Sequence, residues 1–440
     1  MLHRFASVQP GGPEPILMAR AVALFRTRAL MLKKIRTDQL RLGMFLHELC
    51  GSWMDHPFWR AKFVLQDADD LRRLRECGIS EVWIDTALGL DVDGGLSQAE
   101  VALQVEEELE VAAVALPAPA PVATSTRDEL ARAALVSDQA KLKVQSLFGE
   151  ARMGQAIHVE GCLPLVDDII GSVARNQGAL VSLVRLKAQD EYTYMHSVAV
   201  CALMVALART LKLPDDEVRA AGLAGLLHDM GKARIPLAVL NKPGRLTDDE
   251  FRVMRQHPAW GHDLLLTSGD APAMALDVCL HHHEKVDGSG YPHALKADQI
   301  SLHAQMGAVC DVYDAVTSAR PYKAPWDPGE AVRQMAQWKG HFNPKVFQAF
   351  VKTVGIYPIG TLVKLQSGRL GVVTEQNAES LLTPRVKVFF STRSMLPVRQ
   401  EVLDLAERTA ADRIVSVEQP EKWNFKGLDD LWIDGALPRR

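Results

Sequence analysis

The segment 225–232 has the sequence Gly-Leu-Leu-His-Asp-Met-Gly-Lys and places an imidazole, a carboxylate and an amine at the end of an apolar helical pattern. A carboxylate such as Asp229 has two oxygens that can bridge two cations, whereas an imidazole such as His228 serves one. We expect Gly231 to end the helix and to leave Lys232 just beyond it. An isolated His-Asp pair is more often the polar end of a helix than a metal site. Whether this pair binds metal therefore depends on the other ligand-type residues in the chain.

Other ligand-type residues lie on apolar helical patterns. His196 is followed by apolar residues at i+4, i+7 and i+11, so its imidazole points inward. Asp311 and Asp314 share one face of a helix that we expect at 302–318, in apolar surroundings. A buried carboxylate pair is costly unless cations lie beside it. We interpret one carboxylate as metal-binding and the other as structural.

A capping box that begins at Thr247 starts a further helix, which we expect to carry His257 near its far end, just before Pro258. A second His-Asp pair at 262–263 lacks the following Gly-Lys, and we expect it on a helix surface.

These residues, with the segments His281-His282-His283-Glu284, Asp287-Gly288-Ser289-Gly290-Tyr291-Pro292 and Asp311-Val312-Tyr313-Asp314, resemble the HD-GYP family, the metal-dependent hydrolases of cyclic di-GMP. The resemblance covers roughly residues 185–330. It implies that Asp229 bridges two metal ions. One ion is completed by His196, His228 and Asp311, and the other by His257, His282 and His283. Imidazole and carboxylate ligands without thiolate favour iron or manganese.

The same resemblance implies that Lys232, Arg320 and Lys323 bind substrate phosphate. The two glycines of the loop 287–292 let its backbone approach a ligand while the loop presents Tyr291. His281 precedes the matching pair, and it is either a second-shell donor or an exposed bystander.

Some family members bind a third metal ion through a glutamate one turn before the first histidine. Tyr192 occupies that position, and Glu191 lies roughly 100° away around the helix. We therefore expect a binuclear centre.

A chain of 440 residues predicts two or three domains. We expect a mainly α protein: a leader at 1–32, a small α+β domain at 33–95, a helix and Pro/Ala-rich linker at 96–126, an all-helical HD-GYP domain at 127–355, an antiparallel β extension at 356–415 and a loosely held tail at 416–440. The domain at 33–95 resembles the domain of unknown function that often precedes HD-GYP domains. The glutamates at 106–110 are expected to form a solvated helix face.

The formal charge of −4 argues against a nucleic-acid polymer as partner, and six scattered cysteines indicate reduced core thiols in the cytoplasm. Arginines interrupt the apolar segment 16–32, so we expect neither a transmembrane span nor a signal peptide. The sequence is compatible with a start at either Met1 or Met31. It is also compatible with a homo-oligomer.

The sequence therefore predicts a cyclic di-GMP phosphodiesterase. One alternative is a hydrolase of another cyclic dinucleotide, such as cyclic GMP-AMP. The other is a catalytically silent binding or scaffold protein that recruits diguanylate cyclases.

Overall fold

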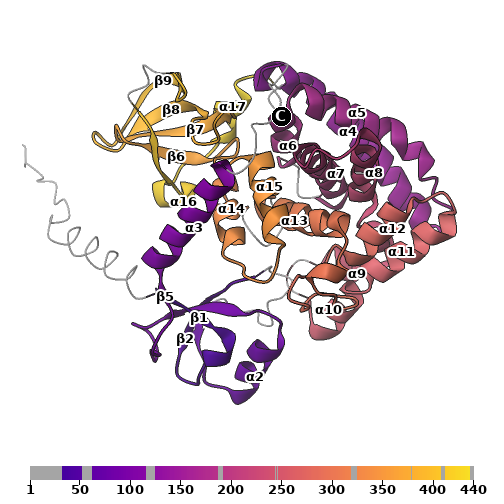
Figure 1. Ribbon diagram of the computed structural model, residues 1–440, viewed down its shortest axis with the longest axis horizontal. Helices are drawn as coiled ribbons and strands as arrows, with labels where there is room; N and C mark the ends of the chain where they lie inside the picture. Colours follow the sequence, from indigo (N-terminus) through magenta and orange to yellow (C-terminus); the bar gives the residue numbers. More distant parts are fainter. Residues whose placement is uncertain are drawn as a thin grey trace, which may run out of the picture. The chain divides into compact units, whose positions relative to one another are not determined.

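The computed structural model describes residues 32–51, 62–114, 124–186, 192–242, 244, 246–318, 325–377, 379–407 and 412–436. The chain divides into two compact units, Met1–Gln104 and Val105–Arg440 (Figure 1). Several predictions lie outside the described residues: the leader up to residue 31, the Pro/Ala-rich linker at 115–123, and the phosphate-binding roles of Arg320 and Lys323. The finer domain limits expected from the sequence stay predictions.

The first unit is the expected small α+β structure. Its antiparallel sheet has the strand order β3-β2-β4-β1-β5. The strands are β1 (Leu32–Arg36), β2 (Phe45–Leu49), β3 (Phe63–Val64), β4 (Glu81–Asp85) and β5 (Leu96–Ser97). Helix α2 (Ala68–Glu76) begins where the Asp67 side chain accepts a hydrogen bond from the amide of Asp69. Leu74 of α2 is buried in one cluster with Val82 and Ile84 of β4.

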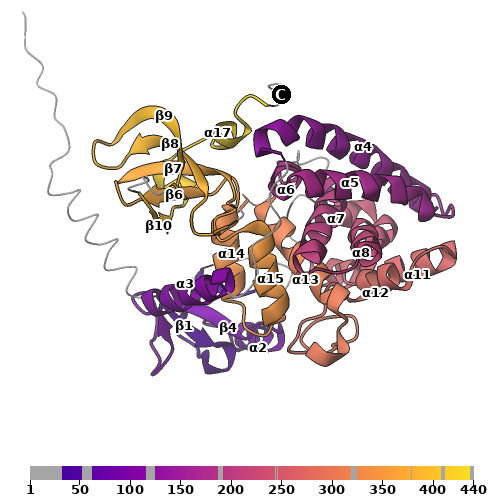
Figure 2. The same cartoon turned by 45° about the horizontal axis from the view of Figure 1, so that its top comes forward.

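The second unit is mainly helical, and α7 lies at its centre. Its helices are α3 (Gln98–Val114, which begins in the first unit), α4 (Thr126–Arg152), α5 (Leu163–Arg175), α6 (Gln177–Val184), α7 (Tyr192–Thr210), α8 (Asp215–Leu227), α9 (Leu237–Leu240), α10 (Asp248–Met254), α11 (His257–Ser268), α12 (Ala273–His281), α13 (Leu302–Thr317), α14 (Pro328–Ala336) and α15 (Pro344–Val354). Helix α7 packs against α4, α5, α6, α8, α13 and α15 (Figure 2).

Among the described helices, Thr193–Thr210 is the one stretch long and apolar enough to cross a membrane. Because 78% of that stretch is buried inside the structure, it has the character of a core helix. All six cysteines are free thiols, and five of them are buried, as expected.

The predicted β extension forms a second antiparallel sheet of order β10-β6-β7-β8-β9. Its strands are β6 (Leu362–Leu365), β7 (Arg369–Glu375), β8 (Arg385–Ser391), β9 (Leu396–Asp404) and β10 (Ile414–Val417). The prediction of a loose tail is wrong for the described residues up to 436. Helix α16 (Pro420–Trp423) follows the sheet, and α17 (Asp429–Ile433) packs on β7 with Trp432 only 2% exposed. A buried indole offsets the entropy of ordering this segment.

The glutamates of α3 form the expected solvated face at Glu107, Glu108 and Glu110, and Glu106 is partly buried. Glu106 pairs with Arg333 of α14 at 2.7 Å, and Glu108 pairs with Lys339 at 2.7 Å. These ion pairs place the second half of α3 against the helical unit.

The sequence predicted that Gly231 ends a helix and that His257 lies near the far end of another. Both predictions are wrong, because they leave out the close approach of Gly231 to the start of α11. Helix α8 ends at Leu227, and Gly231 lies inside the 3-10 helix η5 (Met230–Arg234). A Cβ atom on Gly231 would lie 1.8 Å from the carbonyl oxygen of His257 and 2.5 Å from the amide nitrogen of Gly261. His257 begins α11, because Pro258 has no amide hydrogen and is tolerated only in the first helical turn. Gly231 thus permits the close approach that brings His257 to Asp229.

We predict that Gly231→Ala forces η5 and α11 apart. The free energy of unfolding should fall by about 3 kcal/mol, the upper end of overpacking costs, and metal content should fall with it. Gly149→Ala is the matched control, because a Cβ there meets no atom within 4 Å, and it should stabilise α4 by about 0.5–1 kcal/mol. Urea denaturation and elemental analysis measure both effects. Equal stability of the two variants would contradict the close approach.

Candidate metal centre

Five helices bring seven predicted ligands together in the core of the second unit. His196 comes from α7, the His228–Asp229 pair follows α8, and His257 begins α11. The other ligands are His282 and His283, which follow α12, and Asp311 of α13. All except His283 are buried, and the imidazole of His283 is 10% exposed.

The carboxylate of Asp229 lies between two groups of ligands. Its Oδ2 atom is 3.4 Å from Nε2 of His196 and 3.3 Å from Nε2 of His228. Its Oδ1 atom is 3.2 Å from Nε2 of His257 and 3.9 Å from Nε2 of His282. Each oxygen therefore faces a different pair of imidazoles.

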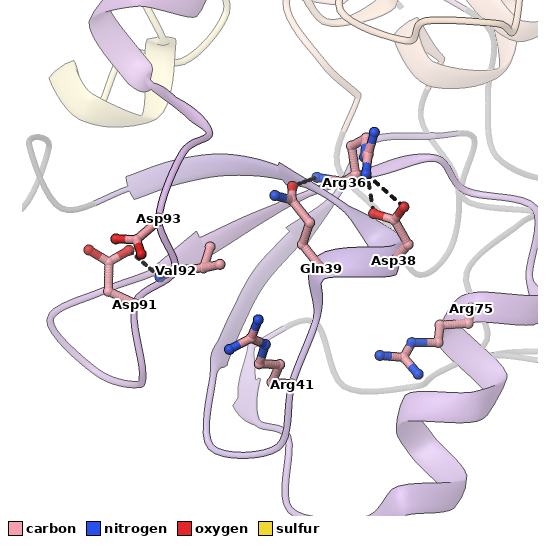
Figure 3. A pocket seen from close by; sticks show the side chains of 8 residues that line it. All are labelled: Arg36, Asp38, Gln39, Arg41, Arg75, Asp91, Val92 and Asp93. Atoms are coloured by element: carbon pink, nitrogen blue, oxygen red, sulfur yellow. Dashed lines mark hydrogen bonds and ion pairs between the residues drawn. The ribbon is translucent and has the colours of Figure 1, made fainter.

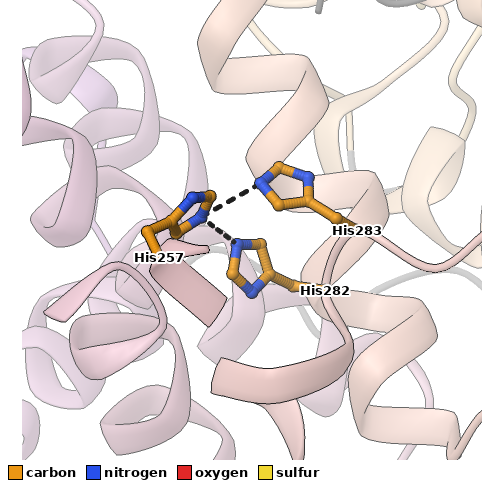
Figure 4. Close-up of side chains that lie close together, drawn as sticks. All are labelled: His257, His282 and His283. Carbon is orange, nitrogen blue, oxygen red and sulfur yellow. Dashed lines mark hydrogen bonds between the residues drawn. The ribbon is translucent and has the colours of Figure 1, made fainter. Parts of the chain in front are cut away.

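The two groups are compact enough for one ion each. His196, His228 and Asp311 offer ligand atoms that all lie within 4.8 Å of one another, and so do His257, His282 and His283. Figure 4 shows the second group, in which Nε2 of His257 lies 3.3 Å from Nε2 of His282 and 3.2 Å from Nε2 of His283. Nitrogen and carboxylate donors in this arrangement suit divalent transition-metal ions.

Outer contacts orient the imidazoles. Nδ1 of His228 lies 2.8 Å from the carbonyl oxygen of Gly225, and Nδ1 of His257 lies 2.8 Å from that of Met254. Because a carbonyl only accepts, these Nδ1 atoms carry the hydrogen and Nε2 presents a lone pair. Asp314 contacts Nδ1 of His196 at 2.6 Å, so it occupies the predicted structural position beside Asp311.

The charges and burial of the site favour an ionised Asp229 carboxylate and a neutral His282 imidazole. Burial raises the pKa of Asp229, but the charges of Lys232 and His228 outweigh it and hold that pKa well below its usual value. Burial, reinforced by neighbouring histidines, lowers the pKa of His282 to about 3. Burial lowers the pKa of His228 too, but the charges of Asp229 and Asp311 outweigh it, and the net shift is upward.

Two buried atoms support a fit to metal. Within the residues that the structure describes, Nε2 of His228 and Oδ1 of Asp229 have no hydrogen-bond partner. Buried polar atoms without partners cost about 1–3 kcal/mol each, and a cation beside each of these two atoms would offset that cost.

The remaining predicted residues lie around this centre. Lys232 contacts Oδ2 of Asp229 through its Nζ atom. Tyr291 stacks on the imidazole of His283 with ring centroids 4.7 Å apart. The second His-Asp pair, at 262–263, is partly exposed on α11 as expected. Tyr192 begins α7, and its side chain lies outside the described atoms.

Neither role predicted for His281 fits the structure. Its imidazole is mostly buried, and among the described contacts it touches none of the seven ligands. Its imidazole is 17% exposed, with Nδ1 placed 2.7 Å from Asp277 and Nε2 placed 3.1 Å from Nδ1 of His293.

No role was predicted from the sequence for two residues that contact Tyr291 or its loop. The guanidinium of Arg255 lies 4.3 Å from the centroid of the Tyr291 ring, within cation–π range. Glu284 is 2% exposed, and its two oxygens accept hydrogen bonds from the amides of His293 at 2.7 Å and Leu295 at 2.9 Å. In the sequence, the only indications of these contacts were the position of Arg255 two residues before His257 and the position of Glu284 directly after the three histidines.

The first unit has a polar pocket of about 530 Å³, lined by Arg36, Asp38, Gln39, Arg41, Arg75, Asp91, Val92 and Asp93 (Figure 3). Arg36 pairs with Asp38 at 2.9 Å, and Asp91 pairs with Lys33 at 2.6 Å. The acidic and basic side chains of the lining largely offset one another, so this pocket does not resemble a hydrolytic centre.

A helical core around two ligand groups that share one carboxylate defines a metal-dependent phosphohydrolase. Residues 173–346 match the HD domain family, and residues 32–162 match the domain of unknown function DUF3391. The chain is 58% identical over 403 residues to cyclic di-GMP phosphodiesterase PA4108 of Pseudomonas aeruginosa, covering 91% of this chain and 96% of that protein. The protein belongs to the HD-GYP family.

Two further relatives match shorter parts of the chain. The cyclic di-GMP phosphodiesterase response regulator RpfG of Xanthomonas campestris pv. campestris is 43% identical over 148 residues, which is 33% of this chain and 39% of that protein. The 3'3'-cGAMP-specific phosphodiesterase 2 of Vibrio cholerae is 35% identical over 170 residues, which is 38% of this chain and 32% of that protein.

We predict that Glu284→Gln loosens the loop that carries Tyr291. Glutamine keeps one accepting oxygen and turns a donor toward the other amide, so a charge-assisted hydrogen bond worth about 1.5–3 kcal/mol is lost. Amide hydrogen exchange at 288–296 should accelerate by about tenfold to a hundredfold. Glu107→Gln, at an exposed position of α3, is the control and should leave this exchange unchanged. Unaltered loop exchange in Glu284→Gln would exclude the assigned role.

Proposed function

We propose that the protein hydrolyses cyclic di-GMP to linear pGpG. The observation that carries this proposal is Asp229, whose two oxygens face separate imidazole pairs at 3.2–3.9 Å in a fold shared over 91% of the chain with a cyclic di-GMP phosphodiesterase. A bridging carboxylate of this kind is what a two-metal phosphodiesterase requires.

In this proposal Asp229 would contribute one carboxylate oxygen to each of two ions. His196, His228 and Asp311 complete one, and His257, His282 and His283 complete the other. Two ions in these positions would supply a nucleophile at neutral pH and neutralise phosphoryl charge. Asp314 and the carbonyls behind His228 and His257 hold the imidazoles in the ligating tautomer. The donor set supports iron or manganese.

The protein's own cations then act on the substrate. Lys232, 17% exposed beside Asp229, supplies positive charge to the phosphate nearest the centre. Tyr291 is assigned to the substrate by family resemblance, and its ring, only 9% exposed, lies against the Arg255 guanidinium and the His283 imidazole. Arg320 and Lys323 are assigned to the phosphates by family resemblance alone.

Cyclic GMP-AMP is the second candidate substrate. The similarity to a Vibrio cholerae cyclic GMP-AMP phosphodiesterase favours it, but that similarity covers only 38% of this chain. A silent scaffold that recruits diguanylate cyclases is a weaker proposal, because the seven ligands are present together. We place the activity in the cytoplasm.

Two alanine variants separate metal binding from chemistry. Asp229→Ala should abolish turnover and lower metal content, because losing the bridge removes a ligand from both ions. Lys232→Ala should retain metal but slow cyclic di-GMP hydrolysis by about a hundredfold or more. Elemental analysis and steady-state kinetics measure both, with His262→Ala as the control. Turnover by Asp229→Ala, or loss of metal from Lys232→Ala, would reverse the assigned roles.

The product distribution tests the binuclear proposal. With Tyr192 at the position of a third-metal ligand, the linear product should be held weakly, and pGpG should accumulate before GMP appears. A tyrosine hydroxyl is a poor ligand at neutral pH because its ordinary pKa is about 10. Chromatography of a time course with manganese or anaerobic ferrous iron, beside Tyr192→Glu, measures this. GMP without a pGpG intermediate, or a third ion held within the metal centre of the wild-type chain, would refute it.

A further inference from the structure

A second group of ligand-type side chains lies at the end of α12, apart from the seven ligands. His281, the last residue of α12, points Nε2 toward Nδ1 of His293 in the loop after Pro292. The two nitrogen atoms are 3.1 Å apart, and the ring planes are inclined by 55°. His293 is exposed, so solvent and ions reach this pair.

The spacing suits two imidazole ligands of one ion. Zinc–nitrogen bonds of about 2.0–2.1 Å, at angles between about 90° and 110°, separate the two nitrogens by about 2.8–3.4 Å. A hydrogen bond between the rings would give a similar spacing, so the distance alone does not distinguish the two arrangements.

The support behind His281 distinguishes this pair from a chance contact. Asp277, one turn earlier in α12, accepts a hydrogen bond at 2.7 Å from Nδ1 of His281, and its other oxygen accepts from the hydroxyl of Ser301. The contact with Asp277 therefore fixes the hydrogen on Nδ1 of His281. It leaves the lone pair on Nε2 of His281, which faces His293. A carboxylate behind an imidazole is the usual second shell of a metal-ligating histidine.

The backbone of His293 is fixed as well. Its amide donates to Glu284, which is buried and follows directly after the two histidines that we assign to the metal centre. Both imidazoles are therefore presented from anchored positions, which lowers the entropic cost of binding an ion.

We propose that His281 and His293 form a peripheral site for a zinc-like divalent transition-metal ion, completed by water. The bound ion joins the end of α12 to the loop 288–296, which carries Tyr291. Zinc at this site stabilises that loop against opening, independently of the ions in the metal centre.

The test uses the full chain saturated with manganese. Equilibrium dialysis against zinc with manganese in excess, followed by elemental analysis, gives the zinc bound per chain. Wild type should bind one more zinc ion than His293→Gln and His281→Gln. Asp277→Asn should weaken this binding by about tenfold to a hundredfold. His262→Gln, a partly exposed histidine on α11, is the matched control and should bind as wild type does.

Hydrogen exchange provides the second measurement. Zinc should slow amide exchange at 288–296 in wild type and His262→Gln, but not in His293→Gln. Thermal unfolding without zinc verifies that each variant is folded. Equal zinc content in wild type and His293→Gln, whether from no uptake or from exchange into the metal centre, would overturn the proposal. Because neither measurement uses a cyclic dinucleotide, the result does not depend on the proposed hydrolysis.

Discussion

The burial of the Asp229 carboxylate is the constraint on which the helical unit depends. Removing such a charge from water costs several kcal/mol unless opposite charge and hydrogen-bond donors surround it. Lys232 supplies a cation, and the imidazoles arrive from helices that are distant in the chain. The desolvation cost of Asp229 is offset only when those helices bring their imidazoles together around its carboxylate. Folding of this unit and assembly of its ligands are therefore one process, and bound metal would add its free energy directly to stability.

Local patterns predicted those parts of the structure that depend on local chemistry. The apolar spacing around His196 and the shared face of Asp311 and Asp314 follow from helical periodicity, and α13 matches the helix expected at 302–318 within one residue. The errors concern contacts between distant segments. The role of Gly231 depends on the backbone of α11, and the burial of Trp432 depends on β7. No local pattern contains either partner.

The β extension belongs to the helical unit through contacts made by backbone atoms. Asp327 accepts hydrogen bonds from the amide of Gly329 at the start of α14 and from the amide of Leu362 in β6. Arg185, after α6, donates to the carbonyl oxygen of Ile359 at 3.1 Å. One partly buried carboxylate thus starts a helix and joins it to a strand. This arrangement explains why the chain from 105 to 440 forms one compact unit and not two.

Glu284 holds the loop after Pro292 by its main chain, through the amides of His293 and Leu295. An amide is present whichever side chain follows it, proline excepted. The shape of the loop is therefore insulated from its side chains, and substitutions at 293 and 295 are free to accumulate without moving Tyr291. Such a loop is a place where related proteins can diverge in what they sense while keeping the same chemistry.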